Sequence, residues 1–331
     1  MDLNLNFKSI SVVGLEKNTG KTETLNYLIK KLNKTKILGL TSIGIDGEKC
    51  DQVTYTSKPE IKIKENMIFA TSEKHFLQKK FNAEILYVSN SKTSLGRIVI
   101  ARSLENGLVL LSGPSSTYKM YEIINKIKNY NSDTVLIDGA ISRLSPSSPF
   151  ITESMILTTG AAVSLNQKEL VKKTVHVFNL ININPYKGLY SEEFKKYEEG
   201  IFYIKENNFY RLNIKTLLNI KNLNKDISEY SYKIYTTGSL TNNFIKYLIE
   251  RKDTGKFEII VKDYTKLFLS SEIFLLFLKR GGKLRVLKKP NLIAITVNPV
   301  SPQGYIMNSD NIVSDLKNYI DIPIFDVRKV D

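Results

Sequence analysis

The sequence predicts an α/β protein with a largely parallel sheet that is covered by helices on both faces. Three observations lead to this fold class. Short apolar runs alternate with amphipathic stretches through the first half of the chain, and a glycine-containing loop ending in Gly-Lys-Thr joins the first run to the first amphipathic stretch. A second series of the same kind begins near residue 233. The chain has 331 residues, and domains commonly hold about 100–200 residues, so we expect two domains.

The first half begins with an apolar strand over residues 10–13 and a helix over residues 22–34. Within this helix, Leu25, Leu28, Ile29 and Leu32 fall at the spacing that makes one apolar stripe. The runs that follow predict further strands over 37–40, 98–101, 108–111, 134–137 and 155–157, and further helices over 118–128 and 167–177.

The second half differs in composition before it returns to the same pattern. Residues 181–230 are rich in Asn, Lys and Tyr and show little periodicity, so we expect a connection with short elements there. The pattern then predicts strands over 233–236, 257–261 and 292–297 and helices over 242–250 and 271–279. We therefore expect one domain over residues 1–180 and a smaller α/β domain over 181–331, which is the candidate for binding a partner.

The charge of the chain is strongly positive but evenly spread. Lys and Arg total 48, Asp and Glu total 33, and the formal net charge is +15. Because the excess is similar in both halves and no nucleic-acid motif accompanies it, we expect a solvated surface and no nucleic-acid partner. The only cysteine, Cys50, excludes a disulfide framework. No apolar run approaches the roughly 20 residues of a membrane span, and the first residues do not read as a signal peptide, so we expect a cytoplasmic protein without a membrane partner.

The strongest chemical signal is the loop between the first strand and the first helix. It runs from Gly14 to Thr22 and ends in Gly20-Lys21-Thr22, the end of a phosphate-binding loop in its expected context. Glycine lets backbone N–H groups approach phosphate oxygens at the positive end of the helix. Lys21 would reach the β- and γ-phosphates, and the Thr22 hydroxyl would ligate Mg²⁺. The residues expected to bind ATP are Gly14, Lys17, Asn18, Thr19, Gly20, Lys21 and Thr22. A strand-turn-helix that contains Gly-Lys-Thr by chance is the alternative.

The spacing of this loop departs from the commonest pattern. Gly14 lies seven residues before Lys21, and Leu15 stands where the first glycine usually lies. This spacing resembles dethiobiotin synthetase and its relatives, within a fold of the P-loop NTPase type. Lys17 lies four residues before Lys21, whereas the signature lysine of the ParA and MinD ATPases lies five before, so we expect no catalytic role for Lys17.

Two carboxylates are candidates for the magnesium site. Asp138 ends the apolar run 135–137, at the strand edge where ligands gather in open parallel sheets, although a capping Asp in a turn is the alternative. Asp46 lies in the loop after the second strand, where relatives of dethiobiotin synthetase supply an acidic residue to the metal. Glu48 is the second candidate in this loop. The alternative is a polar loop without a metal ligand. We expect Lys21, Asp138 and Asp46 to be the catalytic residues, and Thr22, Asp46 and Asp138 to hold the metal.

Other polar residues carry weaker signals. Arg143 is a possible γ-phosphate contact, although an exposed loop arginine is the simpler interpretation. His75 and His176 show no metal-ligand spacing, so we expect structural roles for both. The chain has no Asn-Lys-x-Asp motif for guanine, which favours ATP over GTP.

Five stretches together resemble one bacterial family. They are residues 13–22, 40–48, 137–140, 159–162 and 298–302, which read VGLEKNTGKT, LTSIGIDGE, IDGA, TGAA and NPVSP. The chain resembles the P-loop subunit of the lysine 5,6-aminomutase reactivase of lysine-fermenting anaerobes. The resemblance extends over most of the chain, and the stretches beyond the phosphate-binding loop carry its specificity.

This resemblance implies an ATPase that acts as a reactivating chaperone. Such a factor would use ATP to release damaged cobalamin from an adenosylcobalamin-dependent aminomutase, together with a MutS-like subunit. The loop around Asp46 is then the candidate for a nucleotide-sensitive switch. Two alternatives remain: an ATP-dependent ligase of small molecules, similar to dethiobiotin synthetase, and a binding protein that senses nucleotide without hydrolysing it.

Overall fold

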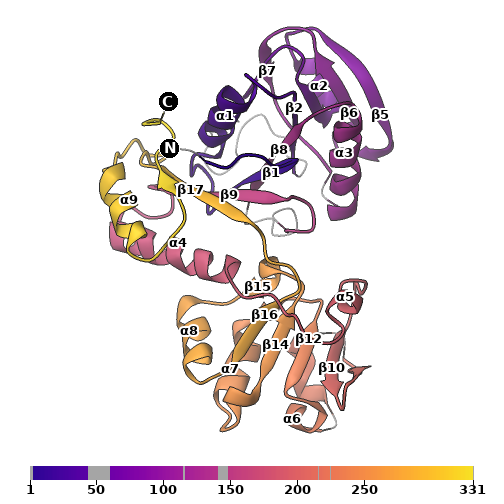
Figure 1. Ribbon diagram of the computed structural model, residues 1–331, viewed down its shortest axis with the longest axis vertical. Helices are drawn as coiled ribbons and strands as arrows, with labels where there is room; N and C mark the ends of the chain where they lie inside the picture. Colours follow the sequence, from indigo (N-terminus) through magenta and orange to yellow (C-terminus); the bar gives the residue numbers. More distant parts are fainter. Residues whose placement is uncertain are drawn as a thin grey trace. The chain divides into compact units, whose positions relative to one another are not determined.

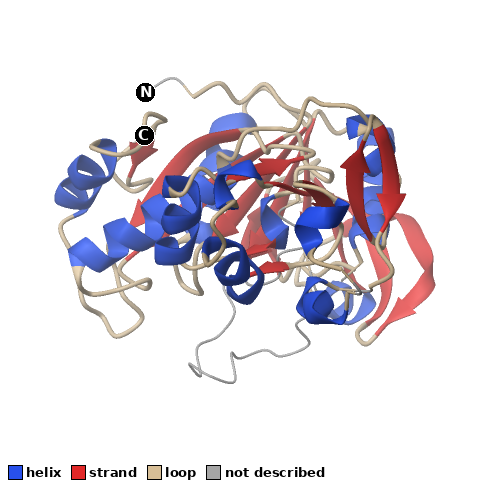
Figure 2. Cartoon of the chain, turned by 90° about the horizontal axis from the view of Figure 1, so that it is seen from below, coloured by secondary structure: helices blue, strands red, loops and turns tan. Residues whose placement is uncertain are grey.

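A computed structural model describes residues 3–43, 60–114, 116–140, 148–214, 216–223 and 225–330 (Figure 1). The predicted residues Asp46, Glu48, Cys50 and Arg143 lie outside these ranges. The chain divides into two units, Met1–Thr174 with Asn291–Asp331 and Val175–Pro290. Figure 2 shows the helices and strands of both units by type.

The first unit is built on a nine-stranded sheet. Its central strands are parallel: β1 (Ser9–Gly14) pairs with β8 (Thr134–Ala140) on one side and with β9 (Ser154–Gly160) on the other. The order is β18 (Ile324–Phe325), β17 (Leu292–Asn298), β9, β1, β8, β2 (Leu38–Ser42), β4 (Ile68–Ser72), β6 (Gly96–Ser103) and β5 (Ala83–Thr93).

One edge of this sheet is antiparallel, so the sheet is mixed. β6 pairs antiparallel with both β4 and β5, and the chain passes from β5 to β6 by a short turn rather than a helix. The run at 98–101 is the middle of β6, and the run at 108–111 overlaps β7 (Gly107–Val109), which pairs with β3 (Ile61–Ile63) in a separate two-stranded sheet. The run at 98–101 is apolar because it is buried, and burial does not specify strand direction. In the run at 108–111 only Val109 is buried, and Leu108 is exposed.

Helices cover both faces of the large sheet, as the sequence predicts. α1 (Lys21–Leu32) packs Leu25 and Leu28 into one buried cluster, which also contains Leu136 of β8. α3 (Thr117–Asn129) packs its isoleucines into a second cluster with Ile137 of β8. Because side chains alternate along a strand, neighbouring residues of β8 face opposite helices. The other helices of this unit are α2 (Glu73–Gln78) and α9 (Ser309–Lys317), and α4 (Gln167–Ile181) begins in it.

The second unit has a five-stranded sheet of its own. Its order is β11 (Asn208–Arg211), β10 (Ile201–Lys205), β12 (Lys233–Thr236), β14 (Glu258–Val261) and β16 (Lys283–Val286). The last three strands are parallel, and α7 (Asn242–Ile249) and α8 (Ser271–Lys279) lie between them in the sequence. The remaining elements are short: α5 (Ser191–Phe194), η3 (Leu217–Asn222), α6 (Ile227–Tyr230), β13 (Leu240–Thr241), η4 (Thr254–Lys256), η5 (Tyr264–Lys266) and β15 (Leu267–Phe268).

The division of the chain differs from the predicted division at residue 180. Residues 291–331 belong to the first unit because β17 pairs in parallel with β9 on one side and with β18 on the other. The second unit is thus an insertion between two strands of the large sheet. Within the described ranges, no helix has the length and apolar character needed to cross a membrane.

Candidate functional site

The predicted phosphate-binding loop lies at the carboxyl end of β1 in the large sheet. β1 ends at Gly14 and α1 begins at Lys21, so the loop occupies residues 15–20. Gly20 has φ 89°, in the left-handed region, and Asn18 has φ 60°. A Cβ on Gly14 would lie 2.6 Å from Thr19 Oγ1. Both glycines are therefore required by the close turn, one by its backbone conformation and the other by space.

Hydrogen bonds hold the loop closed. The buried Thr19 hydroxyl donates to the carbonyl of Glu16 at 3.0 Å and lies 2.8 Å from the Thr158 hydroxyl on β9. The backbone N–H of Leu15 donates to the carbonyl of Thr158 at 2.9 Å. Leu15, which stands where a glycine usually lies, thus continues the pairing of β1 with β9, and its side chain is buried. The loop can therefore hold one more residue than the commonest pattern, because Leu15 adds one hydrogen bond to the pairing of β1 with β9.

The start of α1 is suited to an anion. The residue before the helix is Gly20, which has no side chain to cap the first N–H groups, and the first intrahelical bond runs from Thr24 N–H to Gly20 O at 3.0 Å. The N–H groups of the first turn carry the positive end of the helix dipole, equivalent to about half a unit charge. A phosphate at this position would receive both hydrogen bonds and charge stabilisation.

Lys21 and Asp138 come together across the two central strands. Asp138 lies on β8 opposite Val12 of β1, and its Oδ1 is 3.7 Å from the Nζ of Lys21. Both side chains are partly exposed, at 23% and 30%, so this ion pair contributes little to stability, about 0–1 kcal/mol, and is free to exchange. A phosphate entering the loop would compete with Asp138 for the lysine.

The oxygen donors at this point fit magnesium. Thr22 follows Lys21 at the start of α1 and offers a partly exposed hydroxyl, and Asp138 offers a carboxylate. Mg²⁺ prefers oxygen ligands and is commonly held by one or two protein groups together with phosphates and water. In the described part of the chain, no group of three or more acidic, histidine or cysteine side chains is arranged to hold a metal ion.

The predicted residues are only partly assembled by the described structure. Gly14, Thr19, Gly20, Lys21, Thr22 and Asp138 gather at one sheet edge, whereas Asp46 lies outside the described residues. Lys17 and Asn18 lie exposed on the loop. His75 Nδ1 lies 3.1 Å from Ser112 Oγ, and His176 Nε2 lies 2.8 Å from the carbonyl of Leu269. Both histidines make structural contacts, as expected.

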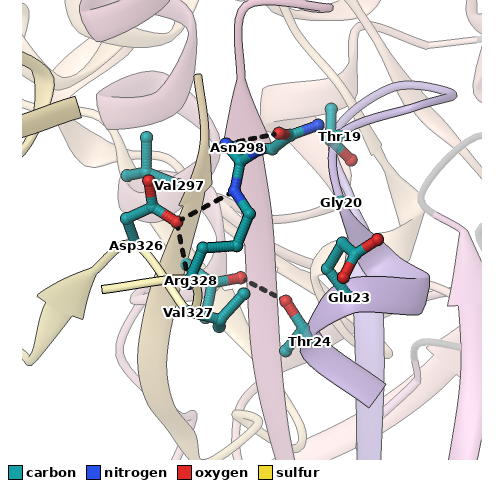
Figure 3. A pocket seen from close by; sticks show the side chains of 10 residues that line it. Thr19, Gly20, Glu23, Thr24, Val297, Asn298, Asp326, Val327 and Arg328 are labelled. Atoms are coloured by element: carbon teal, nitrogen blue, oxygen red, sulfur yellow. Dashed lines mark hydrogen bonds and ion pairs between the residues drawn. The ribbon is translucent and has the colours of Figure 1, made fainter. Parts of the chain in front are cut away.

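The structure adds Asn298, which the sequence analysis included only as the first residue of the stretch 298–302. Asn298 ends β17, and its side-chain Nδ2 donates to the carbonyl of Asn18 in the loop over residues 15–20 at 3.1 Å. Figure 3 shows Asn298 beside Thr19 and Gly20 of this loop. A polar residue at the carboxyl end of an apolar strand was a usable signal, as it was for Asp138. To use this signal, one must know that residues 292–297 form a strand of the large sheet.

Comparisons with known proteins supply no relative for this chain. No family model, no curated protein and no solved structure matches it. A functional assignment therefore depends on the residues of the loop and their geometry.

Proposed function

We propose that the chain binds Mg-ATP at residues 14–22 and hydrolyses it slowly, in a fold of the P-loop NTPase type. One observation carries the proposal: a left-handed Gly20 opens α1 beside Lys21, whose Nζ lies 3.7 Å from the Asp138 carboxylate on the adjacent strand. The loop amides and the helix start bind phosphate oxygens, and Lys21 neutralises their charge.

The magnesium ion in this proposal is held by Thr22 and Asp138, with Asp46 as a further candidate ligand. When bound, magnesium neutralises charge on the phosphate oxygens. Phosphate would replace the Asp138 carboxylate beside Lys21, and Asp138 would then be free to hold the metal or to accept a hydrogen bond from the attacking water. The parallel pairing of β1 with β8 supports this division of roles, because it brings both strand ends to one edge.

The proposed biological role is reactivation of an adenosylcobalamin-dependent aminomutase. It is supported by the resemblance of the five stretches described above, two of which, at 159–162 and 298–302, begin in the last residues of the adjacent strands β9 and β17. The reaction cycle would change affinity for the aminomutase and a MutS-like subunit, so that damaged cobalamin leaves. A nucleotide can shift such an equilibrium only through contacts that differ between the bound states.

A small-molecule ligase similar to dethiobiotin synthetase is the second candidate. The seven-residue separation of Gly14 from Lys21 favours it. The two candidates differ in what accelerates ATP turnover, since a ligase needs a small acceptor and a reactivase needs its protein partners.

Phosphate release from Mg-ATP tests the proposal. We would measure it with the full chain alone, with the aminomutase and MutS-like subunit, and with a panel of small carboxylates and amines. Lys21→Ala should abolish release in every arm, whereas Lys30→Ala, at an exposed position on the same helix, should leave it unchanged. Stimulation by the proteins supports the reactivase. Stimulation by a small acceptor alone contradicts the reactivase and favours the ligase.

A further inference from the structure

Asn298 occupies a position that is fixed by its backbone. It is the last residue of β17 and pairs with Gly160 of β9, and its carbonyl accepts a hydrogen bond from the Ala161 N–H at 2.9 Å. Gly160 has φ 152°, and a Cβ placed on it would collide with the carbonyl of Asn298. The two strand ends are therefore in direct backbone contact, and the Asn298 side chain projects from a rigid base.

The side-chain amide of Asn298 is fully engaged. Its Nδ2 donates to the carbonyl of Asn18 at 3.1 Å and to the carbonyl of Val300 at 3.3 Å. Its Oδ1 accepts from the Val300 N–H at 3.3 Å and from Arg328 Nη2 at 3.4 Å. An amide offers two donors and two acceptor sites, and all four are used here. The reversed amide would set its oxygen against the Asn18 carbonyl, so these contacts fix the orientation.

Arg328 is itself held from the C-terminal segment. Its Nε lies 3.5 Å from Oδ1 of the buried Asp326, which directly follows β18, and its backbone N–H donates to the same oxygen at 3.0 Å. Figure 3 shows the guanidinium between Asp326 and Asn298. A chain of contacts thus runs from the C-terminal strand through Arg328 and Asn298 to the phosphate-binding loop.

We infer that Asn298 is a positioning residue that sets the phosphate-binding loop in its nucleotide-binding conformation, and that Arg328 steadies Asn298. A trans peptide directs its C=O and the next N–H to opposite sides. With the Asn18 carbonyl held by Asn298, the Thr19 N–H points to the other side of the loop, available to a phosphate. This matters because Asn18 has a left-handed backbone (φ 60°), a region that asparagine enters more readily than most L-residues, so the hydrogen bond from Asn298 fixes one of several accessible conformations. The inference rests on the proposed nucleotide site.

Two replacements of Asn298 test the inference. Asn298→Ala removes the hydrogen bond to Asn18, and Asn298→Asp keeps the size but sets an oxygen against the Asn18 carbonyl. We expect both to weaken Mg-ATP binding, measured by titration calorimetry, by about tenfold, the value of one hydrogen bond of ordinary strength. Arg328→Met should weaken binding less, by about threefold, and Arg328→Lys less again.

A matched control separates positioning from general packing. The hydroxyls of Thr24 on α1 and Thr296 on β17 lie 2.8 Å apart, so Thr296→Val breaks a contact between β17 and the helix that follows the loop, two residues before Asn298. We expect this variant to lower the melting temperature and leave ATP affinity unchanged. Equal ATP affinity of Asn298→Asp and wild type, or an equal loss in Thr296→Val, would overturn the inference.

A second measurement keeps this inference separate from the proposed function. Amide hydrogen exchange of residues 16–20, measured without nucleotide, should accelerate in Asn298→Ala and stay unchanged in Thr296→Val. If wild type fails to bind ATP, the proposed function falls, and the exchange rates still decide whether Asn298 holds the loop. If Lys21→Ala no longer binds ATP, while Asn298→Ala has the same amide exchange rates and ATP affinity as wild type, only the inference about Asn298 is wrong.

Discussion

Gly20 gives the most quantitative test of the loop geometry. Its φ of 89° lies in the left-handed region, where a Cβ costs about 1–2 kcal/mol. A Cβ at this position would also lie 2.8 Å from Asn298 Cβ, closer than real Cβ contacts come. Asn298 cannot retreat easily because its backbone pairs with Gly160. Forced overpacking of this kind adds about 1–3 kcal/mol, so we expect Gly20→Ala to destabilise the first unit by about 2–5 kcal/mol.

Gly304 is the matched control for this prediction. It has φ 83°, and a Cβ on it would meet no atom within 4 Å. Gly304→Ala should therefore cost only the backbone component, about 1–2 kcal/mol. Both glycines belong to the same unit, so urea unfolding followed by circular dichroism reports both on the same transition. Equal losses in the two variants would refute the close approach of Asn298 to the loop.

Two further predictions concern the second unit. The buried Tyr235 hydroxyl donates to the Phe194 carbonyl at 3.0 Å, so Tyr235→Phe should cost about 1 kcal/mol in urea unfolding near neutral pH. Burial, with the Asp263 charge second, raises the pKa of Tyr235. Wild type should accordingly lose stability as pH rises above about 10, where the unfolded phenol ionises, and Tyr235→Phe should lose less; equal alkaline profiles would contradict this. Hydrogen bonds from Arg251 hold the pKa of Asp226 well below its usual value. This stabilisation is present above about pH 3.9, the ordinary pKa of Asp, and is lost below it. Arg251→Met should therefore make the free energy of unfolding depend less on pH on the acid side. An unchanged dependence at acid pH would contradict the ion pair.

The central part of the fold and site could be predicted from local signals. A strand, a glycine turn and an amphipathic helix are contiguous in the sequence, so residues 10–34 are specified without knowledge of the remainder. Asp138 could be placed because it ends an apolar run, and parallel strands end at one edge. In the structure its Oδ1 lies 3.7 Å from the Nζ of Lys21.

The remaining features depend on contacts between distant residues. The apolar run of β17 resembles that of β14, and nothing local indicates that β17 returns to β9 while β14 pairs with β12. The sequence also did not reveal that β6 forms an antiparallel edge of the sheet, because a buried strand is apolar whether it runs parallel or antiparallel to its neighbours. Asn298 was missed as a site residue for this reason: its contact with the loop depends on a strand pairing between segments more than a hundred residues apart.

Titration calorimetry of the full chain with ATP and Mg²⁺ tests the central claim most directly. Wild type and Lys30→Ala should bind one Mg-ATP with similar affinity, and Lys21→Ala, folded by circular dichroism, should show no binding, because phosphate charge then lacks its neutralising partner. Unchanged affinity in Lys21→Ala, or no heat of binding with wild type, would contradict the assignment of residues 14–22 as a nucleotide site.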